Sequence, residues 1–193
     1  MVSSLYDSVI TREEQSGNLP CAVAILEWIL YSKGRINLED LRKAVEISLK
    51  DEILDPCRLI EGEFGEFLVI IPHAAGGQSA QVGHETFRTY ITQEVPPKYL
   101  IHESPAHARI ARTCLEIMCH PGQGSCWLQI NSIENWTSHF AACKYRNDLE
   151  HGVYKALEKF LKGNGLRYWM TRAPAVRNRW TTLHFGREVK NPY

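Results

Sequence analysis

The chain of 193 residues has no excess of either charge, because 22 lysine and arginine residues balance 22 aspartate and glutamate residues. A net charge of zero leaves no overall field that would draw the chain to nucleic acid or to an anionic membrane. The apolar runs are short, since residues 22–30 and 67–71 are well below the length that crosses a bilayer. The first residues show no basic start followed by an apolar block, so no secretory signal is expected.

The sequence also lacks a disulfide or zinc framework. Its six cysteines are scattered, mostly within apolar stretches, and no two of them form a C-x-x-C pair. This pattern is typical of a reduced, cytoplasmic protein. No internal repeat at a fixed period is present, and the apolar and charged contents of 44% and 23% are ordinary for a globular protein.

A phosphate-binding loop of the form G-x-x-x-x-G-K-[S/T] is missing as well. The nearest glycine pair, Gly76 and Gly77, is followed by glutamine and serine and by no lysine. Without such a loop nothing cradles the phosphates of a nucleotide or places magnesium. We therefore predict that this chain by itself is not an enzyme and carries neither a cofactor nor a metal.

What the sequence does contain is a helix-turn-helix over residues 22–45. In its first half, apolar residues recur with helical spacing and form one face: Ala22, Ile25, Leu26, Ile29 and Leu30. Gly34 then breaks the period, and Asn37 is the expected N-cap of a second helix, with Asp40 as the acidic partner three residues on. Trp28 lies beside the apolar face and is expected to be buried between the two helices.

A β-hairpin is expected to follow the two helices. Residues 64–71 are rich in β-branched and aromatic side chains and end at Pro72, which is typical of a buried strand. Residues 74–79 can turn, and residues 80–83 can return as the partner strand. Two helices followed by a hairpin describe a winged helix, in which the hairpin is the wing.

The remainder of the chain predicts antiparallel helices. One covers residues 84–91, the next begins at Ser104 and Pro105, and others begin at Ser132 and Asp148. The fold class is therefore mainly α: a winged helix with a two-stranded wing, followed by a helical extension. The predicted boundaries place the winged helix at residues 20–97, the helical extension at 98–172 and a disordered tail at 173–193.

The helix with Trp28, the turn at residues 31–35 and the run from residue 36 to 45 resemble a segment of fungal NACHT-type STAND proteins. Those are multidomain signalling ATPases, similar in plan to NOD-like receptors, and the segment follows their nucleotide-binding core. The resemblance implies that residues 1–19 close a preceding small helical domain. It further implies partners: the nucleotide-binding core, a C-terminal repeat domain of ankyrin or WD type, and a second copy on activation. ADP or ATP would bind to the full-length protein.

His84 and Glu85 resemble the histidine-acid pair of the MHD motif in the wider STAND class, with glycine in place of the methionine. The resemblance implies that His84 senses the β-phosphate of ADP from the junction between the wing and the next helix. An imidazole N–H beside a helix start is a favourable partner for an anion. The alternative is a histidine that caps or packs at a strand-to-helix corner.

The sequence contains three other candidate sites. Residues 124–127 are similar to the nucleophile segment of papain-like proteases, with Cys126 as nucleophile and His139, His151 or His184 as its base. None of these histidines has a recognisable context, so a plain loop cysteine is the simpler interpretation.

A zinc site of Cys114, Cys119, His120 and Cys126 has the spacing of no common structural site. DNA binding by the second helix is also not expected. Between Asn37 and Lys50 three cations balance three carboxylates, and the wing turn has no lysine or arginine.

The sequence thus favours the regulatory module of a NACHT/STAND protein, present as a fragment or a short gene product, that couples nucleotide state to opening and oligomerisation. The alternative is a stand-alone helical adaptor that binds a partner protein. A P-loop encoded in frame before residue 1 would distinguish the first from the second.

Overall fold

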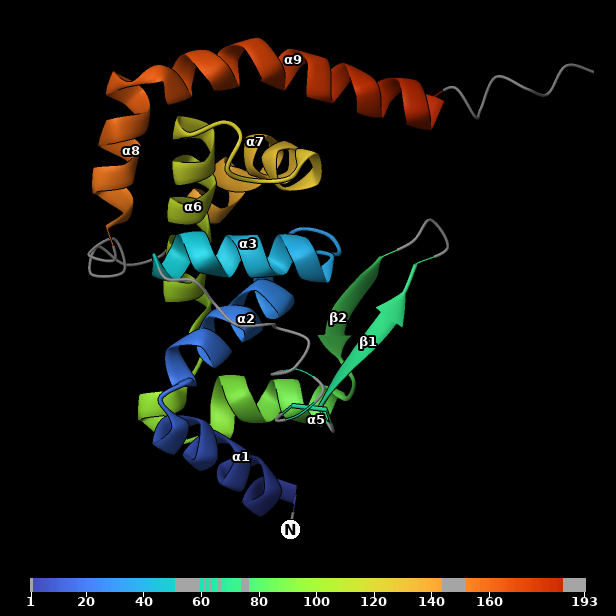
Figure 1. The fold of residues 1–193 in the computed structure, drawn as a ribbon, viewed down its shortest axis with the longest axis vertical. Coiled ribbons are helices and arrows are strands. Elements are labelled where there is room, and N and C mark those ends of the chain that lie inside the picture. Colours follow the sequence, from blue (N-terminus) through green and yellow to red (C-terminus); the bar gives the residue numbers. More distant parts are fainter. Residues whose placement is uncertain are drawn as a thin grey trace, which may run out of the picture.

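The structure is a computed structural model that describes residues 2–50, 60, 62, 64–65, 67–73, 77–143 and 152–185, with side chains described between residues 7 and 174. Figure 1 shows a mainly helical chain with a two-stranded hairpin at one side, which confirms the predicted fold class. The elements are α1 (Val2–Ser16), α2 (Leu19–Tyr31), α3 (Leu38–Leu49), β1 (Leu68–Pro72), β2 (Gln78–Val82), α5 (Glu85–Thr89), the π-turn η1 (Tyr90–Glu94), the 3-10 turn η2 (Pro97–Tyr99), α6 (Glu103–Cys119), α7 (Cys126–Ala141), α8 (Val153–Lys162) and α9 (Asn164–Phe185). In the part of the chain that is described, none of these helices has the length and apolar character needed to cross a bilayer.

Among the described residues, one isolated backbone bridge joins the wing to the helices, and β2 also packs against α2 and α3. β1 and β2 pair antiparallel with Ile70 opposite Ala80, and Ser79 of β2 pairs on its other side with Asn37. Asn37 lies between α2 and α3, so the order across the sheet is the α2–α3 connection, then β2, then β1. This is the order in which a winged helix arranges its three strand segments, and it was not visible in the sequence.

Local residue choices explain the helix-turn-helix. Trp28 is 2% exposed, as expected, and packs in one core with the apolar faces of α2 and α3. Gly34 adopts φ +88° in the turn, a conformation that glycine reaches without steric cost. The Asn37 side chain accepts a hydrogen bond from the Asp40 backbone N–H at 2.8 Å and donates one to the Asp40 carboxylate. The predicted cap is therefore confirmed.

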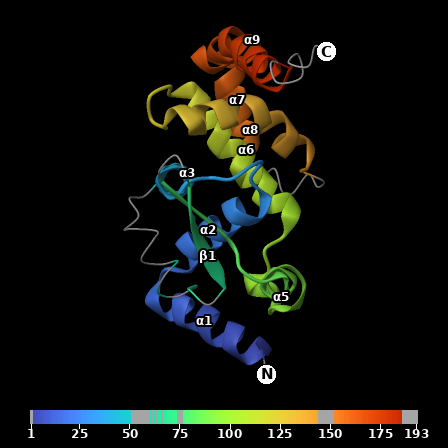
Figure 2. The ribbon, with the colours of Figure 1, turned by 90° about the vertical axis from the view of Figure 1, so that its right-hand side faces the viewer.

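α6 is the spine of the molecule, and Figures 1 and 2 show it passing between the winged helix and the remaining helices. One side of α6 contacts α2 and α3, and its other sides contact α7, α8 and α9. Buried residues of α6, including Ile110, Cys114 and Ile117, share one core with the winged helix. Leu115 and Met118 on the same helix belong to a second, smaller core with Phe160 of α8.

Two arginines of α6 hold the winged helix to this spine. Arg109 forms a bidentate ion pair with Glu27 of α2, and its Nε lies 2.7 Å from Glu27 Oε2. Arg112 donates a hydrogen bond to the backbone carbonyl of Ser48 near the end of α3. Bidentate arginine pairs impose geometry as well as attraction, so α2 and α6 are held in one orientation.

Two helix starts differ from the predictions. α7 begins at Cys126 with Ser125 as its N-cap, and the Ser125 hydroxyl accepts from the Leu128 N–H at 3.0 Å. The predicted start at Ser132 is wrong, because this serine lies inside α7 and donates to the Leu128 carbonyl. α6 begins at Glu103, before Ser104 and Pro105. Proline is tolerated there because the first-turn N–H groups have no intrahelical acceptor.

The other differences concern element ends. β1 begins at Leu68, because Phe64 and Phe67 are joined by a turn in which the Phe67 N–H bonds to the Phe64 carbonyl at 2.8 Å. α9 continues to Phe185 where a disordered tail was expected from residue 173. The loss of an apolar period predicts the end of a buried face, and a helix can run beyond it. The predicted helix start at Asp148 and residues 186–193 lie outside the described residues.

Candidate functional site

His84 lies at the corner between the wing and α5, which is where the resemblance to the MHD motif places its histidine. β2 ends at Val82, and His84 is the N-cap of α5 with an extended backbone. Its Nδ1 accepts a hydrogen bond from the Thr86 N–H at 3.2 Å and lies 2.7 Å from the Thr86 hydroxyl. The histidine therefore caps the helix, and its side chain is exposed to solvent.

This cap determines which nitrogen of the neutral ring carries the proton. Because Nδ1 of His84 accepts from a backbone N–H, it has no hydrogen of its own, and the proton resides on Nε2. The ring thus presents an N–H donor on the side opposite the cap. Such a donor is suited to a phosphate oxygen supplied from outside the chain.

Glu85 is engaged along α5. Its Oε2 lies 3.4 Å from the Nε of Arg88, one turn further on. A carboxylate in the first turn also interacts favourably with the backbone N–H groups of the helix start. The contacts of Glu85 thus support the helix that His84 caps.

The residue before His84 has little room for a side chain. A Cβ at Gly83 would lie 3.1 Å from Val69 Cγ1 and 3.3 Å from the Phe67 carbonyl oxygen. The Gly83 N–H also bonds to that carbonyl at 2.8 Å. This close approach explains why a glycine fits at position 83. Phe87 then stacks on Phe67 with a ring separation of 4.9 Å and fixes α5 on the wing.

α1 is tied to the segment that follows α5. Tyr90 bonds to Asp7, and burial together with this bond raises the pKa of Tyr90. Tyr99 bonds to Glu14, and Lys98 lies 3.0 Å from the same carboxylate. Hydrogen bonds from Tyr99 and Lys98 lower the pKa of Glu14, so the ionised form holds this contact. The His84 corner is thereby connected to the N-terminal helix.

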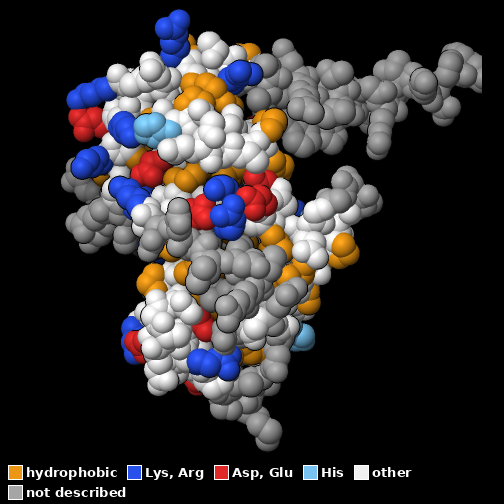
Figure 3. Space-filling view, in the orientation of Figure 1, with side chains coloured by type: hydrophobic (Ala, Val, Ile, Leu, Met, Phe, Trp, Pro, Cys, Tyr) orange, Lys and Arg blue, Asp and Glu red, His pale blue; other side chains and the backbone are white. Residues whose placement is uncertain are grey.

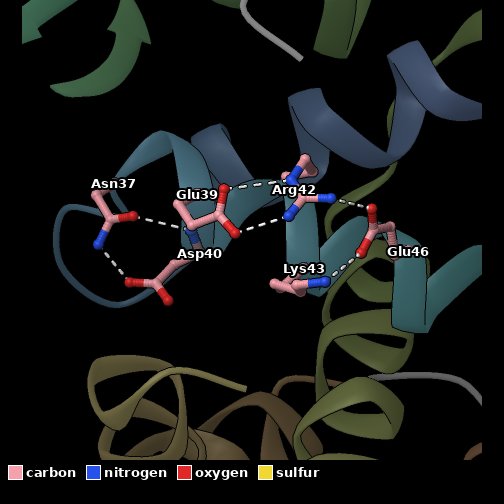
Figure 4. A network of polar contacts seen from close by, with 6 residues as sticks. All are labelled: Asn37, Glu39, Asp40, Arg42, Lys43 and Glu46. Carbon is pink, nitrogen blue, oxygen red and sulfur yellow. Dashed lines mark hydrogen bonds and ion pairs between the residues drawn. The ribbon is translucent and has the colours of Figure 1, made fainter. Parts of the chain in front are cut away.

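The charges on α3 neutralise one another, as Figure 4 shows. Arg42 pairs with Glu39 at 2.7 Å and with Glu46 at 2.6 Å, and Lys43 pairs with Glu46 at 3.1 Å. A helix that reads DNA needs cations that are available to phosphates. The absence of a nucleic-acid partner stays a prediction, and the pairing on α3 agrees with it.

A buried histidine pair joins α6 to α7. His107 Nδ1 lies 2.8 Å from His139 Nδ1, and His107 Nε2 lies 3.8 Å from the Glu103 carboxylate. The carboxylate favours a proton on that Nε2, so His107 Nδ1 accepts from the Nδ1–H of His139. Burial, with smaller contributions from His107 and Lys33, lowers the pKa of His139 to about 3. The pair is separated by 32 residues in the chain, and no spacing rule could have revealed it.

The structure separates the residues of the protease hypothesis. Cys126 begins α7 and His139 lies 13 residues further along the same helix, which corresponds to about 20 Å. A thiolate and its base need hydrogen-bond distance, so these two cannot form a dyad. The side chains of His151 and His184 lie outside the described set.

The structure also argues against the zinc site. Cys114 is fully buried, and burial raises the pKa of its thiol to about 12, which opposes the thiolate that a metal requires. Within the described residues no group of three or more histidine, cysteine or acidic side chains is arranged to hold a metal ion.

Comparisons with known proteins identify no relative: no family model, no curated protein and no solved structure matches the chain.

Proposed function

We propose that this chain is the regulatory module of a NACHT-type STAND signalling protein and that it couples nucleotide state to opening and oligomerisation in the cytoplasm. The observation that carries the proposal is the placement of His84. Its ring is exposed at the end of the wing, its Nδ1 is used by the helix cap, and its Nε2–H points away from that cap. A donor held in this way by the fold is preorganised for an anion.

In the proposed mechanism, the β-phosphate of ADP accepts a hydrogen bond from His84 Nε2 in the closed state. A contact made in one state and lost in the other shifts the equilibrium by the energy of that contact. Charge-assisted hydrogen bonds to phosphate are among the stronger polar contacts in proteins. Loss of ADP would therefore release the winged helix from the nucleotide-binding core.

The spine helix α6 would carry this movement to the rest of the chain. Arg109 binds Glu27 of the winged helix, and Arg112 binds the end of α3, while the same helix packs on α7, α8 and α9. A rotation of the winged helix would thus rotate the helical extension as one body. In the full-length protein this extension would move the repeat domain and expose a surface for self-assembly.

The test joins the chain to a NACHT-type nucleotide-binding core loaded with ADP and compares the parent with His84→Ala. We expect ADP to dissociate about tenfold faster from the variant, corresponding to about 1.4 kcal/mol, and the oligomer to form without a signal. His102→Ala is the matched control, because His102 is an exposed N-cap of α6 whose side chain makes no capping bond. Equal ADP retention and equal oligomer size in parent and His84→Ala would make His84 a packing residue and end the proposal.

A stand-alone adaptor remains the second candidate, and one observation favours it. Of the four large apolar side chains exposed among the described residues, three lie on α8 and α9: Tyr154, Leu161 and Met170. Exposed apolar side chains on adjacent helices are typical of protein-binding surfaces. Sequencing the transcript upstream of residue 1 separates the candidates. A P-loop in frame supports the regulatory module, and a start codon at residue 1 with no P-loop upstream supports the adaptor.

A further inference from the structure

A basic groove lies between the C-terminal end of α3, the second half of α6 and α8. Its volume is about 470 Å³, and its charged lining consists of Lys50, Arg112, Lys155, Lys159 and Lys162 against Glu116 and Glu158. Figure 3 shows lysine and arginine side chains gathered over α8 at the left of the molecule. In both Figures 1 and 2 this region is remote from α5 and the His84 corner.

The three lysines of α8 share one face of the helix. Residues 155, 159 and 162 follow the spacing i, i+4 and i+7, whereas Val153, Ala156 and Phe160 form the buried face. Like charges at this spacing destabilise a helix by a few tenths of a kcal/mol for each pair. Lys162 is compensated by its pair with Glu158, and Lys159 lies 2.7 Å from Nε2 of His120, so the repulsion that remains is between Lys155 and Lys159. None of the three lysines belongs to the buried face of α8, so all three are available to a ligand in the groove.

Arg112 forms a fixed part of the groove wall. Its Nη2 donates to the Ser48 carbonyl, its Nε lies 4.0 Å from Glu116, and its side chain is 20% exposed. Gly152 lies against the Arg112 side chain, since a Cβ at that glycine would lie 3.6 Å from Arg112 Cδ. The guanidinium therefore needs little rearrangement to meet a ligand, which reduces the entropic cost of binding.

The positive charge of the groove is not cancelled by its described lining. Five cations face two carboxylates, and one carboxylate, Glu158, lies 2.5 Å from Lys162. The surplus is local, because the whole chain has a net charge of zero. Residues 51–59 and 144–151, which adjoin the groove in sequence, lie outside the described residues, so this count refers to the described lining alone.

We propose that the groove binds a small ligand with several phosphate groups, either free in solution or as the headgroup of a lipid. A volume near 470 Å³ falls in the range of about 300–1,000 Å³ that small-molecule sites occupy. Arginine offers a planar fork and lysine a point charge, and both are suited to phosphate oxygens. The proposal does not depend on the role of His84, because the two regions share no residue.

The test is calorimetric titration of the whole chain with inositol hexakisphosphate at low ionic strength. Lys155→Gln/Lys159→Gln removes two groove charges and should weaken binding at least tenfold. Lys33→Gln/Arg35→Gln removes two charges from the exposed turn after α2 and should change affinity less than twofold. Glu116→Gln removes a carboxylate from the groove and should tighten binding several-fold, which guards against a loss caused by misfolding.

Sedimentation with phosphatidylcholine vesicles containing 5% phosphatidylinositol bisphosphate identifies the source of the phosphates. Vesicle binding that inositol hexakisphosphate displaces assigns a lipid headgroup. Binding of the soluble compound without vesicle binding assigns a free ligand. Two results would overturn the proposal: an affinity of the parent chain weaker than millimolar for both probes, or an equal loss in the two double variants.

Discussion

The winged helix and the helical extension bury different kinds of side chain. The winged helix buries two carboxylates, Glu27, which pairs with Arg109, and Asp40, whose Oδ2 accepts from Asn37 and whose Oδ1 has no partner among the described atoms. The extension instead buries neutral polar groups at the α6–α7 contact, and His139 is fully buried there with its Nε2 unpaired among the described atoms. The first half is therefore expected to respond to losses of packing and of these polar pairs. The second half should respond to protonation.

The largest effect should follow from removing the tryptophan at the centre of the winged helix. Trp28→Ala deletes a side chain that is 2% exposed and should lower the free energy of unfolding by about 3–5 kcal/mol. Trp136→Ala deletes a partly exposed side chain that contacts Phe160 and Trp169 and should lower this free energy by about 2 kcal/mol. Urea denaturation measures both. An unchanged midpoint for Trp28→Ala would show that α2 and α3 do not pack as described.

Acid should destabilise the extension through His139. Its pKa is lowered to about 3 in the folded chain, against an ordinary value of about 6.5 in the unfolded chain. The unfolded state binds the proton more readily than the folded state. The contribution of neutral His139 to the free energy of unfolding is therefore fully present above pH 6.5 and is lost as the pH falls towards 3. The slope is about 1.4 kcal/mol per pH unit, which amounts to about 2–3 kcal/mol at pH 4.5.

His139→Asn isolates this contribution, because an amide can replace the bond at Nδ1 but does not titrate. Unfolding curves at several pH values should show a flatter dependence between pH 4.5 and 6.5 for the variant than for the parent. His102→Gln, at an exposed histidine, should keep the parent slope. Parallel slopes for His139→Asn and the parent would mean that the buried pair is protonated without cost.

A smaller effect is expected from the ion pair that joins the halves. Glu27→Gln leaves Arg109 without its carboxylate and should cost about 2 kcal/mol, below the value for a fully buried pair because the Arg109 side chain is 28% exposed. Glu39→Gln, at a carboxylate on the surface of α3, should change stability by less than about 0.5 kcal/mol. Chemical denaturation at neutral pH measures the loss of stability in both variants. An equal loss for Glu27→Gln and Glu39→Gln would mean that the ion pair of Glu27 with Arg109 does not hold the two halves together.

The smallest effects concern the two helix caps, one in each half. Ser125→Ala removes one bond, from the Leu128 N–H, and should cost about 1 kcal/mol. Asn37→Ala removes the cap and also the donor to the Asp40 carboxylate, which is 1% exposed, so its cost should approach 2 kcal/mol. Thermal melts resolve the difference. A larger loss of stability for Ser125→Ala than for Asn37→Ala would mean that the hydrogen bond from Asn37 does not stabilise the Asp40 carboxylate.

Most of the fold could be predicted from local patterns. The apolar period around Trp28, the cap at Asn37 and the strand-like run before Pro72 all lie within a few residues of the structure they specify. The bridge between Asn37 and Ser79 joins residues 42 positions apart in sequence and could not be predicted from either segment. The sequence does not distinguish a serine inside a helix, such as Ser132, from a serine that caps one, because only the hydrogen bonds differ.

Less of the candidate sites than of the fold could be predicted from the sequence. The position of His84 followed from the family resemblance, whereas its tautomer depends on the Thr86 N–H. His107 and His139 meet across two helices, and their contact depends on how α6 and α7 pack. One feature of the sequence indicates the basic groove, namely the helical spacing of Lys155, Lys159 and Lys162. Its other walls come from α3 and α6 and required the fold.

The sharing of α6 between two cores has a consequence for synthesis on the ribosome. When the first 97 residues have been made, α2 and the wing can form, but the apolar surface that Ile110 and Cys114 will cover is still bare. Domains generally fold as units while the chain emerges, with the N-terminal unit first. Here the first unit has to wait for a helix that is encoded after it. A pause in translation before residue 119 would thus prolong the exposure of that surface to chaperones and proteases.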